Sequence, residues 1–260
     1  MSMVQGSPLP IGVLDPATTA WVAAVIANGG TVSSTQQGFV DTLIKGLKTD
    51  GIFSKLDRLW LYASENTFQA LTDIVADSLA TAVNSPAFTA NRGYAGNGSN
   101  AEIDSNFNPT TAPSPKFVQD SANLFAWNNT SGTSATPWLC GQGSAGQSQI
   151  TPFFTDNSDY YSLNGSSALN SAGTGATGLY LLNRTSSSTI TLDVNGAQQV
   201  SAGEGSVAIT SSDIFSLENG SGNFGNRQCS CLGFGSGLSG TDRTNIYSRL
   251  RTYMTSVGVP

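Results

Sequence analysis

Apolar residues recur at helical spacing in a segment near the start of the chain. Trp21 and Val25, each followed by another apolar residue, would share one face of a helix. Asp15 precedes Pro16, which places an N-cap before a proline at the first helical position. Asn28 and the two glycines after it end the pattern. The sequence therefore predicts a helix between Asp15 and Asn28.

A second helix is predicted to begin at Ser33 or Ser34 and to end at Asp50. Its apolar positions form one stripe: Phe39, Val40, Leu43, Ile44 and Leu47. Such stripes are usually packing faces. The short apolar run 59–63 predicts a buried strand, and a third helix is predicted from residue 66 or 67 to about residue 79. A last helix is predicted after a cap at Ser239 or Thr241, and its inner face would carry Ile246, Tyr247, Leu250, Tyr253 and Met254.

From about residue 82 the pattern changes to short apolar runs separated by turn residues. The runs predicted to be strands are 124–127, 137–140, 178–183, 189–194, 207–209 and 229–234. Two of them, 179–183 and 189–194, enclose a short polar loop and predict a hairpin. Asn195-Gly196 follows the second as a tight turn. Many short strands at this spacing indicate a sandwich or a barrel.

Composition supports an all-β domain. Hydrophobic residues make up 38% of the chain, enough for a core, whereas charged residues make up only 11%. The net charge of −6 excludes a basic face for nucleic acid. No apolar run reaches the length of a membrane helix, so no membrane insertion is expected. Cys229 and Cys231 are expected to be thiols packed in a core strand, where their spacing would put both on one face, and a disulfide from one of them to Cys140 is the alternative.

Catalysis is not expected. The chain has no histidine, which excludes Ser-His-Asp and Cys-His arrangements. Its four glutamates do not form the run of alternating carboxylates found in jelly-roll glycosidases. The glycine-rich run 233–237 lacks the lysine of a phosphate-binding loop. No cofactor is expected.

Four stretches in order resemble the concanavalin A-like, or laminin-G-like, jelly roll. They are 93–104 (GYAGNGSNAEID), 193–196 (DVNG), 232–239 (LGFGSGLS) and 246–254 (IYSRLRTYM). The segments 27–32 and 55–61 resemble the leader that precedes such domains in structural proteins of tailed phages and prophages. The resemblance implies a helical leader over residues 1–81, packed on the sandwich or docking to the particle, and a β-sandwich ending in a helix over residues 82–260.

The same resemblance implies a function. The protein would be a structural component exposed on a bacteriophage particle, either as capsid decoration or head fibre or as part of the tail or fibre. It would be made in the host cytoplasm and would act through contacts with other virion proteins, in several copies or as a homo-oligomer.

The alternative is a carbohydrate-binding module that attaches to glycans on the host surface. Aromatic rings that could stack on a sugar are Trp127, Trp138, Tyr160 and Tyr161. The two tryptophans fit equally well as core residues, and adjacent tyrosines on a strand would point to opposite faces. Asp156 and Asp159 offer oxygen ligands for Ca²⁺, although four loop residues cannot complete its shell, and a capped turn explains them as well.

Overall fold

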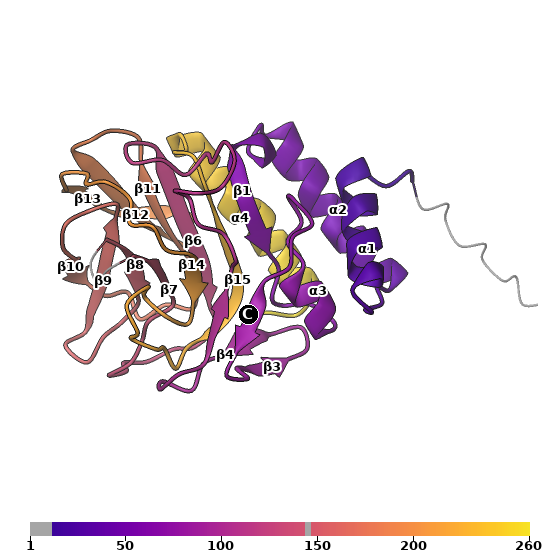
Figure 1. Cartoon of the computed structure of the whole chain (residues 1–260), viewed down its shortest axis with the longest axis horizontal. Coiled ribbons are helices and arrows are strands. Elements are labelled where there is room, and N and C mark those ends of the chain that lie inside the picture. The colour runs from indigo at the N-terminus through magenta and orange to yellow at the C-terminus, as the bar shows by residue number, and fades with distance from the viewer. Residues whose placement is uncertain (1–11, 144–146) are drawn as a thin grey trace, which may run out of the picture.

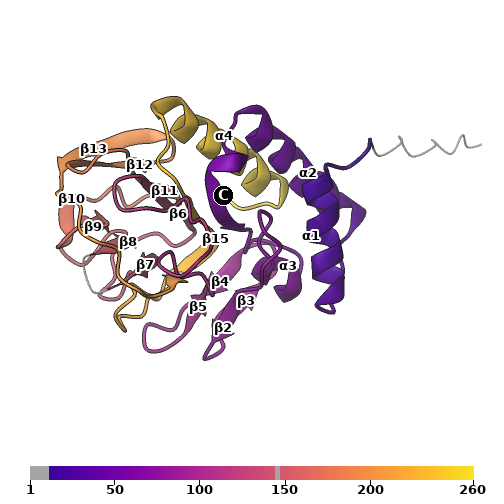
Figure 2. The same cartoon turned by 45° about the horizontal axis from the view of Figure 1, so that its top comes forward.

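The structure is a computed structural model and describes residues 12–143 and 147–260. Two antiparallel sheets face each other, and helices lie on the outer side of the larger sheet, so the molecule has three layers (Figures 1 and 2). This arrangement confirms the prediction of a mainly β, concanavalin A-like sandwich with N-terminal helices and a closing C-terminal helix.

The larger sheet has eight strands. In spatial order they are β13 (Ala197–Gly203), β12 (Thr189–Val194), β11 (Gly178–Arg184), β6 (Ala122–Asn128), β15 (Gln228–Gly235), β4 (Gly93–Ala95) and β3 (Ala87–Thr89), while β1 (Leu56–Trp60) also pairs with β15. The predicted hairpin is β11–β12. Asn195 and Gly196 both have positive φ angles, 53° and 76°, as the predicted tight turn between β12 and β13 requires.

The smaller sheet has seven strands. In spatial order they are β10 (Leu169–Ala172), β9 (Ser158–Leu163), β8 (Ser148–Thr151), β7 (Cys140–Gln142), β14 (Ile214–Ser216), β5 (Glu102–Asp104) and β2 (Thr81–Val83). The predicted strand 137–140 is thus displaced, since β7 begins at Cys140. The predicted strand 207–209 is wrong, because these residues form no strand. The chain there instead hydrogen-bonds across to the loop after β9, through the N–H of Val207 and the carbonyl of Asn164.

Two hydrophobic cores lie on opposite faces of the eight-stranded sheet. Along β6, Leu124 and Ala126 point into the core between the sheets, whereas Phe125 and Trp127 point into the core under the helices. This alternation follows from the two-residue period of a strand. The central strands β6 and β11 of this sheet are therefore buried on both faces.

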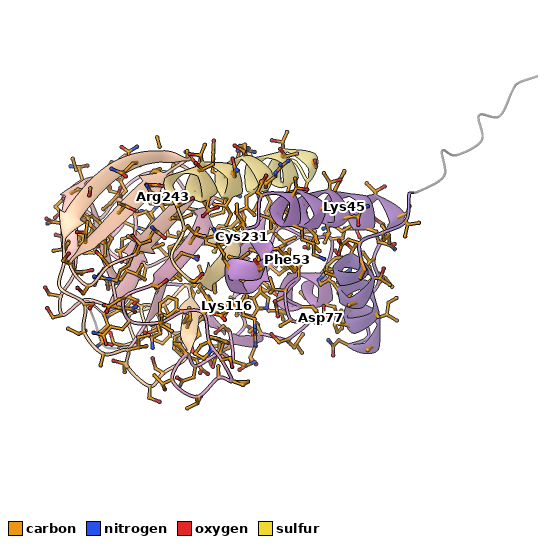
Figure 3. All side chains as sticks on the ribbon, turned by 90° about the horizontal axis from the view of Figure 1, so that it is seen from above. Lys45, Phe53, Asp77, Lys116, Cys231 and Arg243 are labelled. Carbon is orange, nitrogen blue, oxygen red and sulfur yellow. The ribbon has the colours of Figure 1, made fainter. Side chains whose placement is uncertain are left out.

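The helices begin where the sequence predicts. They are α1 (Pro16–Ala27), α2 (Ser34–Thr49), α3 (Thr67–Leu71) and α4 (Gly240–Ser256), with a short 3₁₀ turn, η1 (Phe53–Lys55). Asp15 caps α1, Ser33 caps α2, and Ser239 caps α4 in a reciprocal capping box with Asp242. Seen from above, α2 and α4 lie side by side over the sheet, and Arg243 of α4 reaches Asp193 of β12 (Figure 3).

The prediction of a third helix reaching residue 79 is wrong, because α3 ends at Leu71. The buried Asp73 carboxylate explains the early end. Its Oδ1 accepts from the N–H groups of Val75 and Ala76 at 2.8 and 2.9 Å, and its Oδ2 accepts from the N–H of Ser78 at 2.9 Å. A side chain that takes these backbone donors competes with the helical hydrogen bonds.

The leader contributes a strand to the larger sheet. A buried strand was predicted at residues 59–63, and β1 lies three residues earlier, with Leu59 opposite Gly233 of β15. Residues 61–63 stay buried after the strand ends, and the N–H of Ala63 still donates to the carbonyl of Ser230. Hence the segment that precedes residue 82 holds three helices, α1, α2 and α3, and also β1 of the larger sheet.

All three cysteines are buried and free, so Cys229 and Cys231 are core thiols as predicted and neither forms a disulfide with Cys140. The prediction that Cys229 and Cys231 share one face is wrong. Cys229 lies in the core between the sheets, and Cys231 lies in the core under the helices. The register of β15 against β6 shifts between Cys229 and Leu232, and such a bulge breaks the two-residue alternation.

Candidate functional site

A cavity of about 490 Å³ lies on the outer face of the seven-stranded sheet. Its lining comes from β8, β9 and four loops: Trp138, Gln149, Thr151, Phe154, Tyr160, Ser166, Ser167, Ala168, Asn219 and Asn223. Cavities of 300–1,000 Å³ are typical of small-molecule sites. We call this cavity the sheet pocket.

Strand β8 forms part of the pocket wall. Gln149 and Thr151 both line the pocket, whereas Ile150 between them is buried in the core between the sheets. The alternation along a strand therefore turns both polar side chains outward. Thr151 is only 2% exposed, and its hydroxyl has no hydrogen-bond partner among the described residues.

Three aromatic rings form another side of the pocket. The ring centroids of Trp138 and Phe154 are 6.4 Å apart, and those of Phe154 and Tyr160 are 5.7 Å apart, both in edge-to-face geometry. The Tyr160 hydroxyl donates to Asp156 at 2.7 Å, which ties its ring to the loop before β9. Edge-to-face packing of this kind stabilises rings in a fixed arrangement.

The loop after β14 supplies two amides. Asn219 is nearly buried, and its Oδ1 accepts from the N–H of Ser221 at 3.2 Å and the N–H of Asn223 at 3.3 Å. The loop can lie directly on β7 because Gly141 has no side chain: a Cβ there would lie 2.6 Å from the Cα of Asn219. The neighbouring Glu218 carboxylate accepts from the N–H of Gly220 at 2.5 Å, and burial raises the pKa of this carboxyl.

The structure brings together two of the four predicted aromatic residues. Trp138 and Tyr160 line the sheet pocket. Trp127 is fully buried under α4, where it stacks on Tyr247 at 6.3 Å, and Tyr161 is buried between the sheets. As expected for adjacent strand residues, Tyr160 and Tyr161 point to opposite faces.

The sequence predicted only two of the ten residues that line the pocket, Trp138 and Tyr160. Phe154, Gln149, Thr151 and the two amides were not singled out, because they come from separate segments. The polar-apolar-polar order of residues 149–151 was the available signal for two of them, since it predicts a strand with one exposed face. The turn at Asn219-Gly220 was visible, but nothing local placed it over β7.

Asp156 and Asp159 have different environments. Asp156 is exposed; it accepts from the N–H of Ser158 at 3.0 Å, and its hydrogen bond with Tyr160 lowers its pKa. Asp159 is buried; it accepts from the N–H groups of Phe153 and Thr174, and burial raises its pKa. Both carboxylates thus cap turns. Within the described ranges no three acidic, Cys or His side chains come together as a metal site.

A second surface of interest is the outer side of α1. This helix has no charged residue, and only Thr18, Trp21 and Val25 are buried. Ile26 is 58% exposed, and the ring of Phe68, packed beside Gly30, is 42% exposed. A helix that is apolar all round is normally covered on all sides. We call Ile26, Phe68 and the exposed alanines of α1, which are Ala20, Ala23 and Ala27, the α1 face. None of the helices in residues 12–143 and 147–260 has the length and apolarity to cross a membrane.

The sequence matches no protein-family model and no curated protein. Solved structures do match. The chain is similar to Trypanosoma rangeli sialidase in complex with sialic acid (TM-score 0.55, 10% identity over 84% of this chain and 40% of that one). It is also similar to the binding domain of botulinum neurotoxin DC in complex with rat synaptotagmin II (TM-score 0.57, 11% identity, 76% and 52%). This chain therefore spans about half or less of those chains, and at these identities the likeness shows the fold alone, a concanavalin A-like β-sandwich.

Proposed function

We propose that this protein is a surface component of a bacteriophage particle that displays a carbohydrate-binding pocket. The observation that carries the proposal is the separation of two surfaces. Strands β8 and β9 lie at one end of the molecule and α1 lies at the other (Figure 1). The first two strands carry lining residues of the sheet pocket, and α1 carries the α1 face. One end can attach to a particle while the other faces a host cell.

The pocket suits a sugar because it joins aromatic rings to amides. The C–H face of a pyranose packs on a ring such as Trp138 or Tyr160, and its hydroxyls exchange hydrogen bonds with amides such as Asn223. The fold supports this assignment by analogy, since one structural neighbour is described with bound sialic acid. No carboxylate is among the described lining residues, so the paired acids of glycoside hydrolysis are missing there. We therefore propose binding without catalysis.

Attachment to a particle rests on the α1 face and on the resemblance of residues 27–32 and 55–61 to phage leader segments. An uncharged helix with an exposed Ile26 presents an apolar surface, which is better suited to contact with another protein than to contact with water. The partners proposed are capsid or tail subunits, and the location proposed is the virion, reached from the host cytoplasm by assembly.

The carbohydrate part is tested by a glycan array with the full chain and with Trp138→Ala. We expect binding to a subset of host-surface glycans, and about tenfold weaker binding by the variant. Trp127→Phe, which alters the helix-covered face of the other sheet, serves as the control and should bind normally. Absence of binding to any glycan would reject this part.

The particle part is tested by adding the purified protein to phage particles that lack it. We expect the protein to bind in a fixed ratio, and Ile26→Asp in the α1 face to reduce that ratio because it places a charge in an apolar contact. The Trp138→Ala variant should bind to the particles in the same ratio as the wild type. A protein that remains free in solution contradicts the attachment.

A further inference from the structure

We infer that the sheet pocket selects an uncharged sugar and that the Thr151 hydroxyl is one of its direct contacts. The inference rests on the proposed carbohydrate site and narrows its ligand. It departs from the fold analogy, because the sugar named with the sialidase neighbour is sialic acid, which carries a carboxylate. Two independent observations support it: the charges around the pocket and the unpartnered hydroxyl in its wall.

The described residues that line the pocket include no positively charged side chain that could pair with an anion. Among its described lining residues no side chain is charged, and the polar ones are amides and hydroxyls. Binding of a carboxylate or phosphate usually relies on a guanidinium or ammonium group.

Two carboxylates attached to residues of the pocket wall make an anion less favourable. Asp156 holds the Tyr160 hydroxyl at 2.7 Å, and Glu218 immediately precedes Asn219. Arg227 is 1% exposed and donates to the carbonyls of Pro152 and Phe153, so its guanidinium is turned to the backbone. The chain as a whole has a net charge of −6. An anionic sugar would thus be repelled without compensation.

The Thr151 hydroxyl is the second observation. Buried polar groups nearly always have a hydrogen-bond partner. The Thr151 hydroxyl has none among the described residues, although Thr151 lines the pocket and is only 2% exposed. A ligand hydroxyl that enters the pocket can both donate to and accept from it. Gln149 stands two residues earlier on the same face of β8, so the two side chains offer adjacent polar contacts.

The first test is an array of matched neutral and acidic oligosaccharides, including lactose and 3′-sialyllactose. We expect binding only among neutral members, with a Kd that stays constant from about 0.01 M to about 1 M salt, because no ion pair is screened. Binding that requires the acidic sugar, or that weakens steeply with salt, would overturn the inference and leave carbohydrate binding standing. No binding at all would reject the proposed function itself, and the inference with it.

The second test uses Thr151→Val, which replaces the hydroxyl by a methyl of similar shape. We expect about tenfold weaker binding of the best neutral glycan, with a thermal midpoint equal to or above that of the wild type, because an unpartnered buried hydroxyl is removed. Thr151→Ser keeps the hydroxyl and should bind nearly as well as the wild type. If Thr151→Val binds the glycan unchanged, the hydroxyl is not a contact; if it binds weakly and also melts early, the role is structural.

Discussion

The two sheets of this sandwich are built alike but are covered differently. In the eight-stranded sheet every residue of β6 and β11 is buried, because the other sheet lies on one face and the helices lie on the other. In the seven-stranded sheet β10 alternates between half-buried and exposed residues, and the sheet pocket lies on the outer face beside it. Covering one sheet with helices leaves the other as the surface that can meet a ligand.

The difference is visible in the strands themselves. The run from Leu124 to Trp127 is continuously apolar, as in sheets buried on both faces, whereas in β8 the polar Gln149 and Thr151 stand on either side of the apolar Ile150. A continuous run needs a second cover, and α4 provides it. The same reasoning explains why Trp127 belongs to a core and Trp138 to a pocket, although both are tryptophans near strands.

The largest expected effect comes from exchanging these two tryptophans for alanine. Trp127→Ala should lower the free energy of unfolding by about 3–5 kcal/mol, because it opens a cavity between β6 and α4. Trp138→Ala should lower it by about 1 kcal/mol or less, because the side chain is partly exposed. Urea denaturation of both variants checks the contrast. If the two variants lose a similar free energy of unfolding, Trp127 is no more deeply buried in a core than Trp138.

A somewhat smaller effect is expected at the ion pair that joins the two sheets. Arg184 of β11 donates to the carboxylate of Glu204 at 2.8 Å and to the carbonyl of Leu163 of β9, and it is fully buried. Burial raises the pKa of Glu204, and Arg184 opposes that shift. Arg184→Met should cost about 3 kcal/mol, since it leaves a buried carboxylate unpaired.

The double variant Arg184→Met with Glu204→Leu is the control for this pair. It removes both charges, so it should recover part of the loss. The measurement is a double-mutant cycle by chemical denaturation. Additive losses would mean that the two side chains do not act as a pair.

The fold was largely predictable because its signals are local. Asp15 and Ser239 cap helices as their types and positions indicate, and Asn195-Gly196 forms the turn that its residues favour. Each of these structures depends on a few neighbouring residues. Short-range chemistry therefore sufficed for α1, α2, α4 and the hairpin.

The failures arose where a distant or competing contact decides the structure. Asp73 ends α3 by taking backbone donors that the apolar spacing had assigned to a helix. The bulge in β15 separates Cys229 from Cys231, and it depends on pairing with β6, about a hundred residues away. The sheet pocket combines residues from position 138 to position 223. No periodicity along the chain links such positions.

A modest, pH-dependent effect is expected on the seven-stranded sheet at Glu102 of β5. Burial, with contributions from Glu218 and Asp104, raises the pKa of Glu102 from 4.5 to about 7. Between these two values the folded chain holds a proton that the unfolded chain has lost, so stability falls as pH rises through this window. Glu102→Gln removes that dependence.

The variant should match the wild type at about pH 4, where the Glu102 carboxyl is largely protonated in both the folded and the unfolded chain, and should be more stable by about 1 kcal/mol at about pH 8. This figure is well below the full value of the pKa shift because the carboxyl is partly exposed to solvent. Thermal melts of the two proteins across this range measure the difference. A gap that stays constant with pH would mean that folding does not raise the pKa of Glu102.

The smallest effect on stability is expected at Tyr160. Two variants of this residue distinguish the contribution of its ring from that of its hydroxyl. Tyr160→Phe loses the exposed hydrogen bond to Asp156, so unfolding should change by less than about 0.5 kcal/mol. Glycan affinity should stay within about twofold, because the ring remains against Phe154. Tyr160→Ala should weaken glycan binding about tenfold with little loss of stability. If the Phe variant binds as poorly as the Ala variant, the hydroxyl held by Asp156 is the contact, and the aromatic wall is not what this face of the sandwich presents to a sugar.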